Sequence, residues 1–179
     1  CSSLTELNLS DFNTEKIKDM NCMFTDCSSL KKLDISKFKV NNVLNMGGIF
    51  YGCSSLKEIN LPNFNNNKIY DMSYMFYGCS SLKVLDFSKF YTDNVKHMND
   101  MFGGCSSLKE LNISNFNFNN VFNINQMFAG CSSLEKLILP NINNDKEYDS
   151  YNMFYGCTKE LKKSIINQCN NEYIRKEVI

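Results

Sequence analysis

The chain has 179 residues, of which 43% are hydrophobic, so it is long enough to bury one continuous apolar core. Lysine plus arginine number 19, as do aspartate plus glutamate, and this balance provides no overall field that attracts nucleic acid or an anionic membrane surface. No apolar run approaches the roughly 18 to 20 residues of a membrane-spanning helix, and no secretory signal region is recognisable. We therefore expect one domain that neither binds nucleic acid nor inserts directly into a membrane.

A single repeated unit accounts for most of the sequence. Cysteine recurs every 26 residues from position 1 to position 157, and six of these seven cysteines are followed by Ser-Ser-Leu. Such strict self-similarity is the signature of a repeat architecture. It defines six units, at residues 1–26, 27–52, 53–78, 79–104, 105–130 and 131–156.

The first half of each unit has the pattern of a strand. Leucines and other apolar residues recur as in Leu108, Leu111 and Ile113, and the pattern ends in an alternation of apolar and polar residues. An alternation with period two is typical of a strand with one buried face. The sequence therefore predicts one short strand per repeat.

The second half of each unit has the spacing of a helix. Its apolar residues lie three and four apart, as in Met98, Met101 and Phe102, which places them on one helical face. The residue before the first of these is Asp or Asn in five of six units, and a glycine closes five units. Both are typical helix-boundary residues, so we expect one short helix per repeat. Glu147 and Ser150 replace apolar residues in the sixth unit and weaken its predicted helix.

Neither element buries its apolar face alone, so the units are expected to stack, with strands in a parallel sheet and helices forming the opposite wall. This predicts an α/β solenoid with one short parallel strand and one short helix per 26-residue repeat. Residues 157–179 lack the repeat and are expected to form a helical C-terminal cap. Because solenoid ends normally need covering, the lack of an N-terminal cap suggests a longer repeat array.

The repeat carries a family resemblance. Cys-Ser-Ser-Leu-Lys-Glu-Leu-Asn-Ile-Ser-Asn-Phe, followed by Asn-Gln-Met-Phe, resembles the BspA-like class of leucine-rich repeats over residues 1 to about 157. Proteins of that class occur on the surfaces of bacteria and in some protists. The resemblance implies a leucine-rich-repeat-like, right-handed solenoid and a surface role, and it says little about the ligand.

The cysteines and the histidine point to structure rather than chemistry. Seven cysteines share one repeat position and are expected to form an inward ladder of free thiols, because parallel side-chain directions oppose disulfide pairing. Cys22 and Cys169 lie outside this ladder and are the candidate reactive thiols. His97 replaces the Asp or Asn of other units, and no sequence motif pairs it with a serine or cysteine nucleophile. With no metal-ligand spacing and no glycine-rich phosphate loop, we expect no catalytic residue, metal or cofactor, and no enzyme.

Function is expected from side chains that vary between repeats on the solvent face of the sheet. Counting each repeat cysteine as position 1, these lie at repeat positions 6, 8 and 10, and the candidates are taken from positions 6 and 8. The candidate partner-binding residues are Glu6, Asn8, Lys32, Asp34, Glu58, Asn60, Val84, Asp86, Glu110, Asn112 and Lys136.

Two hypotheses for function follow. The first is a non-enzymatic protein-recognition module from a cell-surface or secreted protein, which mediates adhesion or the binding of a host or other partner. The alternative is a cytoplasmic scaffold or architectural subunit of a larger assembly, suggested by the neutral charge and the reduced cysteines. Both imply a protein partner, and the sequence does not identify it.

Overall fold

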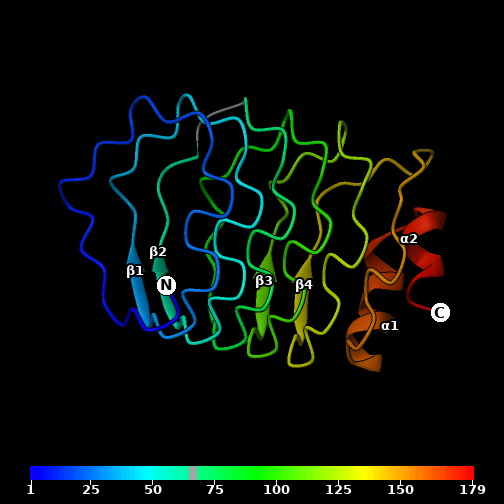
Figure 1. Cartoon of the computed structure of the whole chain (residues 1–179). Coiled ribbons are helices and arrows are strands. Elements are labelled where there is room, and N and C mark those ends of the chain that lie inside the picture. Colours follow the sequence, from blue (N-terminus) through cyan, green and yellow to red (C-terminus); the bar gives the residue numbers. More distant parts are fainter. Residues whose placement is uncertain (65–67) are drawn as a thin grey trace.

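The computed structural model describes residues 1–64 and 68–179. The chain winds through successive coils that stack along one axis, with the N-terminal repeats (blue) at one end and two helices (orange and red) at the other (Figure 1). The molecule is therefore a repeat solenoid, as the sequence predicts. Its apolar interior is one continuous cluster that runs through the stack.

The strands are three residues long and pair in parallel, one repeat apart. Strand β1 (Lys32–Asp34) pairs with β2 (Glu58–Asn60), and β3 (Glu110–Asn112) pairs with β4 (Lys136–Ile138). In each strand the two outer residues are exposed, whereas the central residue faces the core. This confirms the predicted parallel strands with one buried face.

The prediction of a strand in every repeat is wrong for two repeats. Residues 6–8 and 84–86 hold the equivalent positions but form no strand within the described part of the chain. The sheet is consequently divided into two pairs. A three-residue strand is at the short limit of strand lengths, so a small displacement of one repeat is enough to interrupt its pairing.

The predicted helix in each repeat is also wrong. Among the described residues, the second half of every repeat forms tight turns instead. The backbone amides of Met98, Asp100 and Phe102 donate to carbonyls of the following repeat, at 2.9, 2.8 and 2.9 Å. In an α-helix these amides would bond to carbonyls four residues earlier in the same segment. The hydrogen bonds of this wall therefore join neighbouring repeats.

Left-handed backbone conformations explain why no helix forms there. Asp100 has a φ of 56° and Gly104 a φ of 72°, and every repeat has positive φ at the same two positions. Residues of this kind cannot continue a right-handed helix. Between them, i to i+3 hydrogen bonds such as Gly103 N to Asp100 O (3.0 Å) close successive turns. The spacing of three and four between apolar residues comes from these turns, which bury Met98, Met101 and Phe102.

The expected helix caps form a different local structure. Asp19, Asn45, Asp71 and Asn123 each accept the backbone amide two residues later through Oδ1, at 2.8, 2.9, 2.8 and 3.1 Å. This is an Asx turn, which starts the chain of tight turns rather than a helix. The backbones at this repeat position also pair from one repeat to the next, in a second parallel ladder.

Two side-chain ladders fill the core behind this wall. Six phenylalanine rings stack along the axis with centroids 5.1 to 6.1 Å apart, at residues 24, 50, 76, 102, 128 and 154. Beside them five of the repeat cysteines donate their thiols to phenylalanine carbonyls 29 residues earlier, as from Cys79 Sγ to Phe50 O (3.2 Å). Each such carbonyl also accepts a turn amide, so the thiol uses its second lone pair.

All nine cysteines are free thiols. Burial raises the pKa of Cys53 to about 12 and raises the pKa of Cys79 further. The interpretation of Cys169 as a reactive thiol is wrong, because this side chain is 4% exposed and burial raises its pKa. Cys22 is exposed, as is Cys1 at the open end of the ladder.

The last repeat is adapted to two terminal helices, α1 (Lys159–Gln168) and α2 (Glu172–Lys176). Asn171 is fully buried, and its Oδ1 caps α2 by accepting the amides of Tyr173 and Ile174. Its Nδ2 donates to carbonyls of the last repeat. Ser150, which replaces an apolar residue, donates its hydroxyl to the Tyr173 carbonyl at 3.0 Å. These polar contacts fasten the helices to the end of the core.

Truncation of a ladder phenylalanine tests how far stability depends on the stack. Phe76→Ala leaves a cavity between the rings of two neighbouring repeats and is expected to lower the free energy of unfolding by about 3–5 kcal/mol. Urea denaturation followed by circular dichroism measures this change. Tyr155→Ala, at a side chain that is 69% exposed, is the control and should have a small effect. Similar losses for the two variants would contradict a packed stack.

Thiol modification tests the cysteine ladder. In the native protein at pH 8, iodoacetamide should modify Cys1 and Cys22 and leave Cys53, Cys79 and Cys105 unmodified, because buried thiols are neither accessible nor ionised. Mass spectrometry of peptides locates the modified residues. In urea all nine cysteines should react. Rapid native modification of Cys79 would show that the ladder is open.

Candidate functional site

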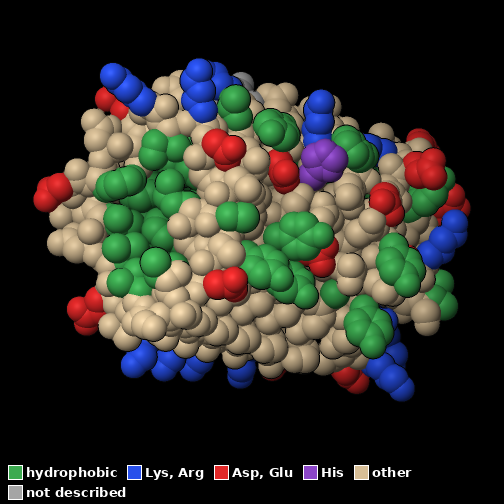
Figure 2. Space-filling view, in the orientation of Figure 1, with side chains coloured by type: hydrophobic (Ala, Val, Ile, Leu, Met, Phe, Trp, Pro, Cys, Tyr) green, Lys and Arg blue, Asp and Glu red, His purple; other side chains and the backbone are tan. Residues whose placement is uncertain are grey.

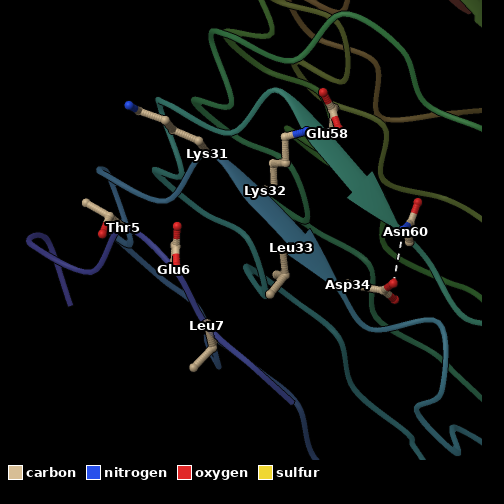
Figure 3. Close-up of a pocket in the computed structure, with 9 residues that line it drawn as sticks. All are labelled: Thr5, Glu6, Leu7, Lys31, Lys32, Leu33, Asp34, Glu58 and Asn60. Atoms are coloured by element: carbon tan, nitrogen blue, oxygen red, sulfur yellow. Dashed lines mark hydrogen bonds and ion pairs between the residues drawn. The ribbon is translucent and has the colours of Figure 1, made fainter. Parts of the chain in front are cut away.

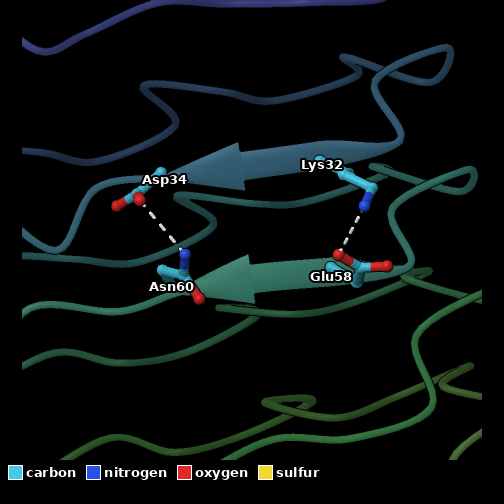
Figure 4. Close-up of polar contacts among 4 residues, drawn as sticks. All are labelled: Lys32, Asp34, Glu58 and Asn60. Carbon is cyan, nitrogen blue, oxygen red and sulfur yellow. Dashed lines mark hydrogen bonds and ion pairs between the residues drawn. The ribbon is translucent and has the colours of Figure 1, made fainter.

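The eleven candidate residues all have exposed side chains on the strand face. Two contacts join β1 to β2: Lys32 Nζ lies 2.8 Å from Glu58 Oε2, and Asn60 Nδ2 donates to Asp34 Oδ2 at 3.1 Å (Figure 4). Lys136 Nζ and Glu110 Oε2 are 3.9 Å apart on the next pair of strands. Exposed ion pairs of this kind contribute only about 0–1 kcal/mol each. The pairs at position 6 thus neutralise charge more than they stabilise the fold.

The structure brings five of the candidates together around one hollow. This hollow, of about 730 Å³, lies over the first three repeats and includes Glu6, Lys32, Asp34, Glu58 and Asn60. In Figure 3 the leucines that line it point away from the polar side chains. A second hollow of about 390 Å³ contains Val84 and Glu110. The remaining candidates, Asn8, Asp86, Asn112 and Lys136, line neither of these two hollows.

The candidates at repeat position 8 have a structural task that the sequence analysis did not assign to them. Asp34 and Asp86 each accept the backbone amide two residues later, at 2.9 and 2.8 Å, and Asn8 and Asn112 do so at 3.0 Å. Hydrogen bonds from the following serine lower the pKa of both aspartates. These side chains form Asx turns, which end the strand at Asp34 and Asn112 and recur at Asn8 and Asp86, where no strand forms. Position 6 is therefore freer than position 8 to specify a partner.

A row of lysines beside the candidates escaped the sequence analysis. Repeat position 5 is lysine in four consecutive repeats, and all four side chains are exposed. The Lys57 amide donates to the Lys31 carbonyl at 2.9 Å, so the residues occupy adjacent rungs. None of the four forms an ion pair with another described residue. We call these residues the lysine row, and they are Lys31, Lys57, Lys83 and Lys109. The recurrence of lysine at position 5 is visible when the repeats are aligned, but the candidates were chosen at positions 6 and 8 only.

The tight turns in the second half of each repeat form the wall opposite the strands, which we call the turn wall. It carries a further recess, of about 630 Å³, that sequence reasoning also missed. Gly47 and Gly48 lie in it, together with Tyr51, Asp71 and Tyr74. Other repeats have side chains at both glycine positions. The Gly-Gly pair was a visible signal, but a missing side chain indicates a recess only when its neighbours in space are known.

Within residues 1–64 and 68–179, no group of three His, Cys, Asp or Glu side chains is arranged to hold a metal ion. The helices of this same part of the chain are all too short or too polar to cross a membrane.

Stacked coils with short parallel strands, inward leucines and an exposed strand face define a leucine-rich-repeat-like solenoid. The chain belongs to the family described as "Mycoplasma protein of unknown function, DUF285", whose model matches residues 1–85 and 56–168. Comparison with curated proteins gives no match. A similar solved structure is the crystal structure of the T. pallidum Leucine Rich Repeat protein, with 20% identity and a TM-score of 0.48 over 88% of this chain and 79% of that chain.

Substitution at position 8 tests its structural role. Asp86→Ala removes the acceptor of the Ser88 amide and is expected to lower the free energy of unfolding by roughly 0.5–1.5 kcal/mol. Asp86→Asn should have little effect, because Asn8 and Asn112 make the same turn in other repeats. Urea denaturation of both variants provides the comparison. Equal losses for Ala and Asn would mean that charge, not the Asx turn, matters at this position.

Proposed function

We propose that the strand face is a protein-recognition surface, and that the chain is the binding part of a cell-surface or secreted protein that mediates adhesion or partner binding. The surface consists of the exposed residues at repeat position 6 and the lysine row at position 5. The module acts by binding and carries out no chemical reaction. The BspA-like character of the repeat supports the surface location.

The observation that carries this proposal is the contrast between the two positions. Charges at position 6 compensate one another, as in the pair formed by Lys32 and Glu58. The lysine row forms no ion pair with any described residue, although the chain as a whole has no net charge. Like charges on adjacent rungs repel one another when no ion pair engages them, so these lysines do not stabilise the fold. A partner with an acidic surface would relieve this repulsion. The complementary charges would also orient that partner and raise its rate of association.

The size of the surface limits the affinity. Six rungs separated by about 4.8 Å give a face roughly 29 Å long, and with about 13 Å of strand length this offers near 400 Å². A stable interface uses about 800 Å² per partner. We therefore expect one such face to bind weakly, with tighter binding where further repeats extend the same face.

A cytoplasmic scaffold or architectural subunit is the second candidate function. The free thiols of the buried ladder favour it, because disulfides are rare in reducing compartments. In this case the same strand face would hold a permanent neighbour in an assembly. Biotinylation of intact source cells separates the two: labelling of the protein from outside supports the surface role, and labelling only after lysis supports the scaffold.

Charge reversal on the lysine row tests the recognition surface. A photo-crosslinking amino acid at position 58, introduced into the protein in source cells, should form a crosslink to one partner. The double substitution Lys57→Glu and Lys83→Glu should reduce this crosslink at least tenfold, because it turns attraction to an acidic surface into repulsion. Quantitative mass spectrometry measures the crosslinked product.

The matched control reverses the same number of charges elsewhere. Lys18 and Lys163 are also exposed but lie outside the strand face, and reversing both should leave the crosslink within twofold of the parent protein. Circular dichroism should show the same fold for all variants. An unchanged crosslink in the variant with a reversed lysine row would refute the proposed surface.

A further inference from the structure

The recess on the turn wall is formed by an exception to the repeat. Gly47 and Gly48 occupy positions that hold Asn21 and Cys22 in the preceding repeat, and Ser and Tyr in the following one. The missing side chains leave a hollow bounded by the neighbouring repeats, with a volume of about 630 Å³. This is within the usual range of about 300–1,000 Å³ for small-ligand sites.

Acceptor oxygens surround the floor of the recess. A Cβ atom placed on Gly47 would lie 3.1 Å from Asn21 Oδ1, 3.2 Å from Asn45 Oδ1 and 3.6 Å from Asp71 Oδ2. Asn45 Oδ1 accepts the Gly47 amide, and Asp71 Oδ1 accepts the Ser73 amide. Asp71 Oδ2 accepts no hydrogen bond from another described residue. The floor therefore favours a ligand group that donates hydrogen bonds and carries positive charge.

Tyrosine rings form the side of the recess. Tyr51 stacks on Tyr77 with centroids 5.0 Å apart and ring planes inclined by 13°, and Tyr74 lies 6.3 Å from Tyr51. Burial raises the pKa of Tyr74 and that of the nearby Asp100 carboxyl, which is 6% exposed. Aromatic faces attract cations and pack against alkyl chains.

The charge of the lining agrees with the geometry. It includes the Asp71 carboxylate and the His97 imidazole, and no lysine or arginine. Figure 2 shows the face that bears the histidine: acidic and apolar side chains occupy its centre, whereas lysine and arginine side chains lie toward its edges. An anionic ligand would find no lysine or arginine here, and a neutral ligand would offer the Asp71 carboxylate no opposite charge.

We propose that this recess binds an alkylammonium group. The ammonium donates to Asp71 Oδ2 and Asn21 Oδ1, and the alkyl chain lies against the rings of Tyr51 and Tyr74. A free amine and a lysine side chain of a peptide share this chemistry. The site lies on the wall opposite the strand face, so it does not depend on the recognition surface proposed above.

Binding is tested with n-butylammonium as the probe and n-butanol as its neutral counterpart, by chemical-shift changes in the ¹⁵N-labelled protein. The ammonium should shift the amides around Gly47 and Gly48 and bind at least tenfold more tightly than the alcohol. Nα-acetyl-lysine N-methylamide identifies the source: tighter binding than n-butylammonium indicates a lysine side chain of a peptide, and equal binding indicates a free amine. Either result supports the site. Equal affinity for the alcohol and the ammonium would overturn it.

Variants with matched controls locate the interaction. Asp71→Asn keeps the Asx turn, as Asn45 does, and should weaken ammonium binding at least tenfold. Asp19→Asn removes a charge at the same repeat position outside the recess and should change the affinity less than twofold. Tyr51→Leu should also weaken binding, whereas Tyr155→Leu, at the same repeat position, should not. Unchanged affinity in Asp71→Asn, or equal losses in Asp71→Asn and Asp19→Asn, would refute the proposal.

Discussion

The hydrogen bonds between successive repeats are the constraint on which the rest of the structure depends. In the turn wall, amides at every second residue donate to the next repeat, and this fixes the rung separation. That separation lets the phenylalanine rings stack at 5.1 to 6.1 Å and lets five of the repeat thiols each reach a phenylalanine carbonyl 29 residues earlier. Cysteine suits its position because it is small and apolar yet still donates a weak hydrogen bond. A bulkier apolar side chain would leave that carbonyl lone pair unused.

Much of the fold was predictable because the repeat is regular. The six units, the parallel strands and the buried cysteine, leucine, methionine and phenylalanine positions follow from the 26-residue period. The tight turns that take the place of the predicted helix were not predictable in this way. A run of tight turns buries side chains three and four apart, as a helix does, so the spacing of Met98, Met101 and Phe102 fits both. The positive φ of Asp100, a non-glycine residue, gave no sequence signal.

The functional surfaces were less predictable than the core. Sequence placed the eleven candidates on the exposed strand face, but it could not show that Asp34 and Asp86 are engaged in Asx turns. The recess at Gly47 depends on Asn21 and Asp71, which lie 26 and 24 residues away and meet only through stacking. The burial of Cys169 depends on the terminal helices, which lie outside the repeat. In each case the missing information was a contact between segments.

The turn wall also gives the solenoid a net dipole along its axis. Strands of a β-sheet alternate in the sense of their peptide dipoles, which largely cancel. Here Met20, Cys22, Phe24 and Asp26 all donate toward the second repeat, and most equivalent amides in later repeats point the same way. Aligned peptide units, each with a dipole of about 3.5 D, add as they do in an α-helix. The wall therefore has a negative pole at its first repeat and a positive pole at its last, so the polarity of the stack is built into its backbone.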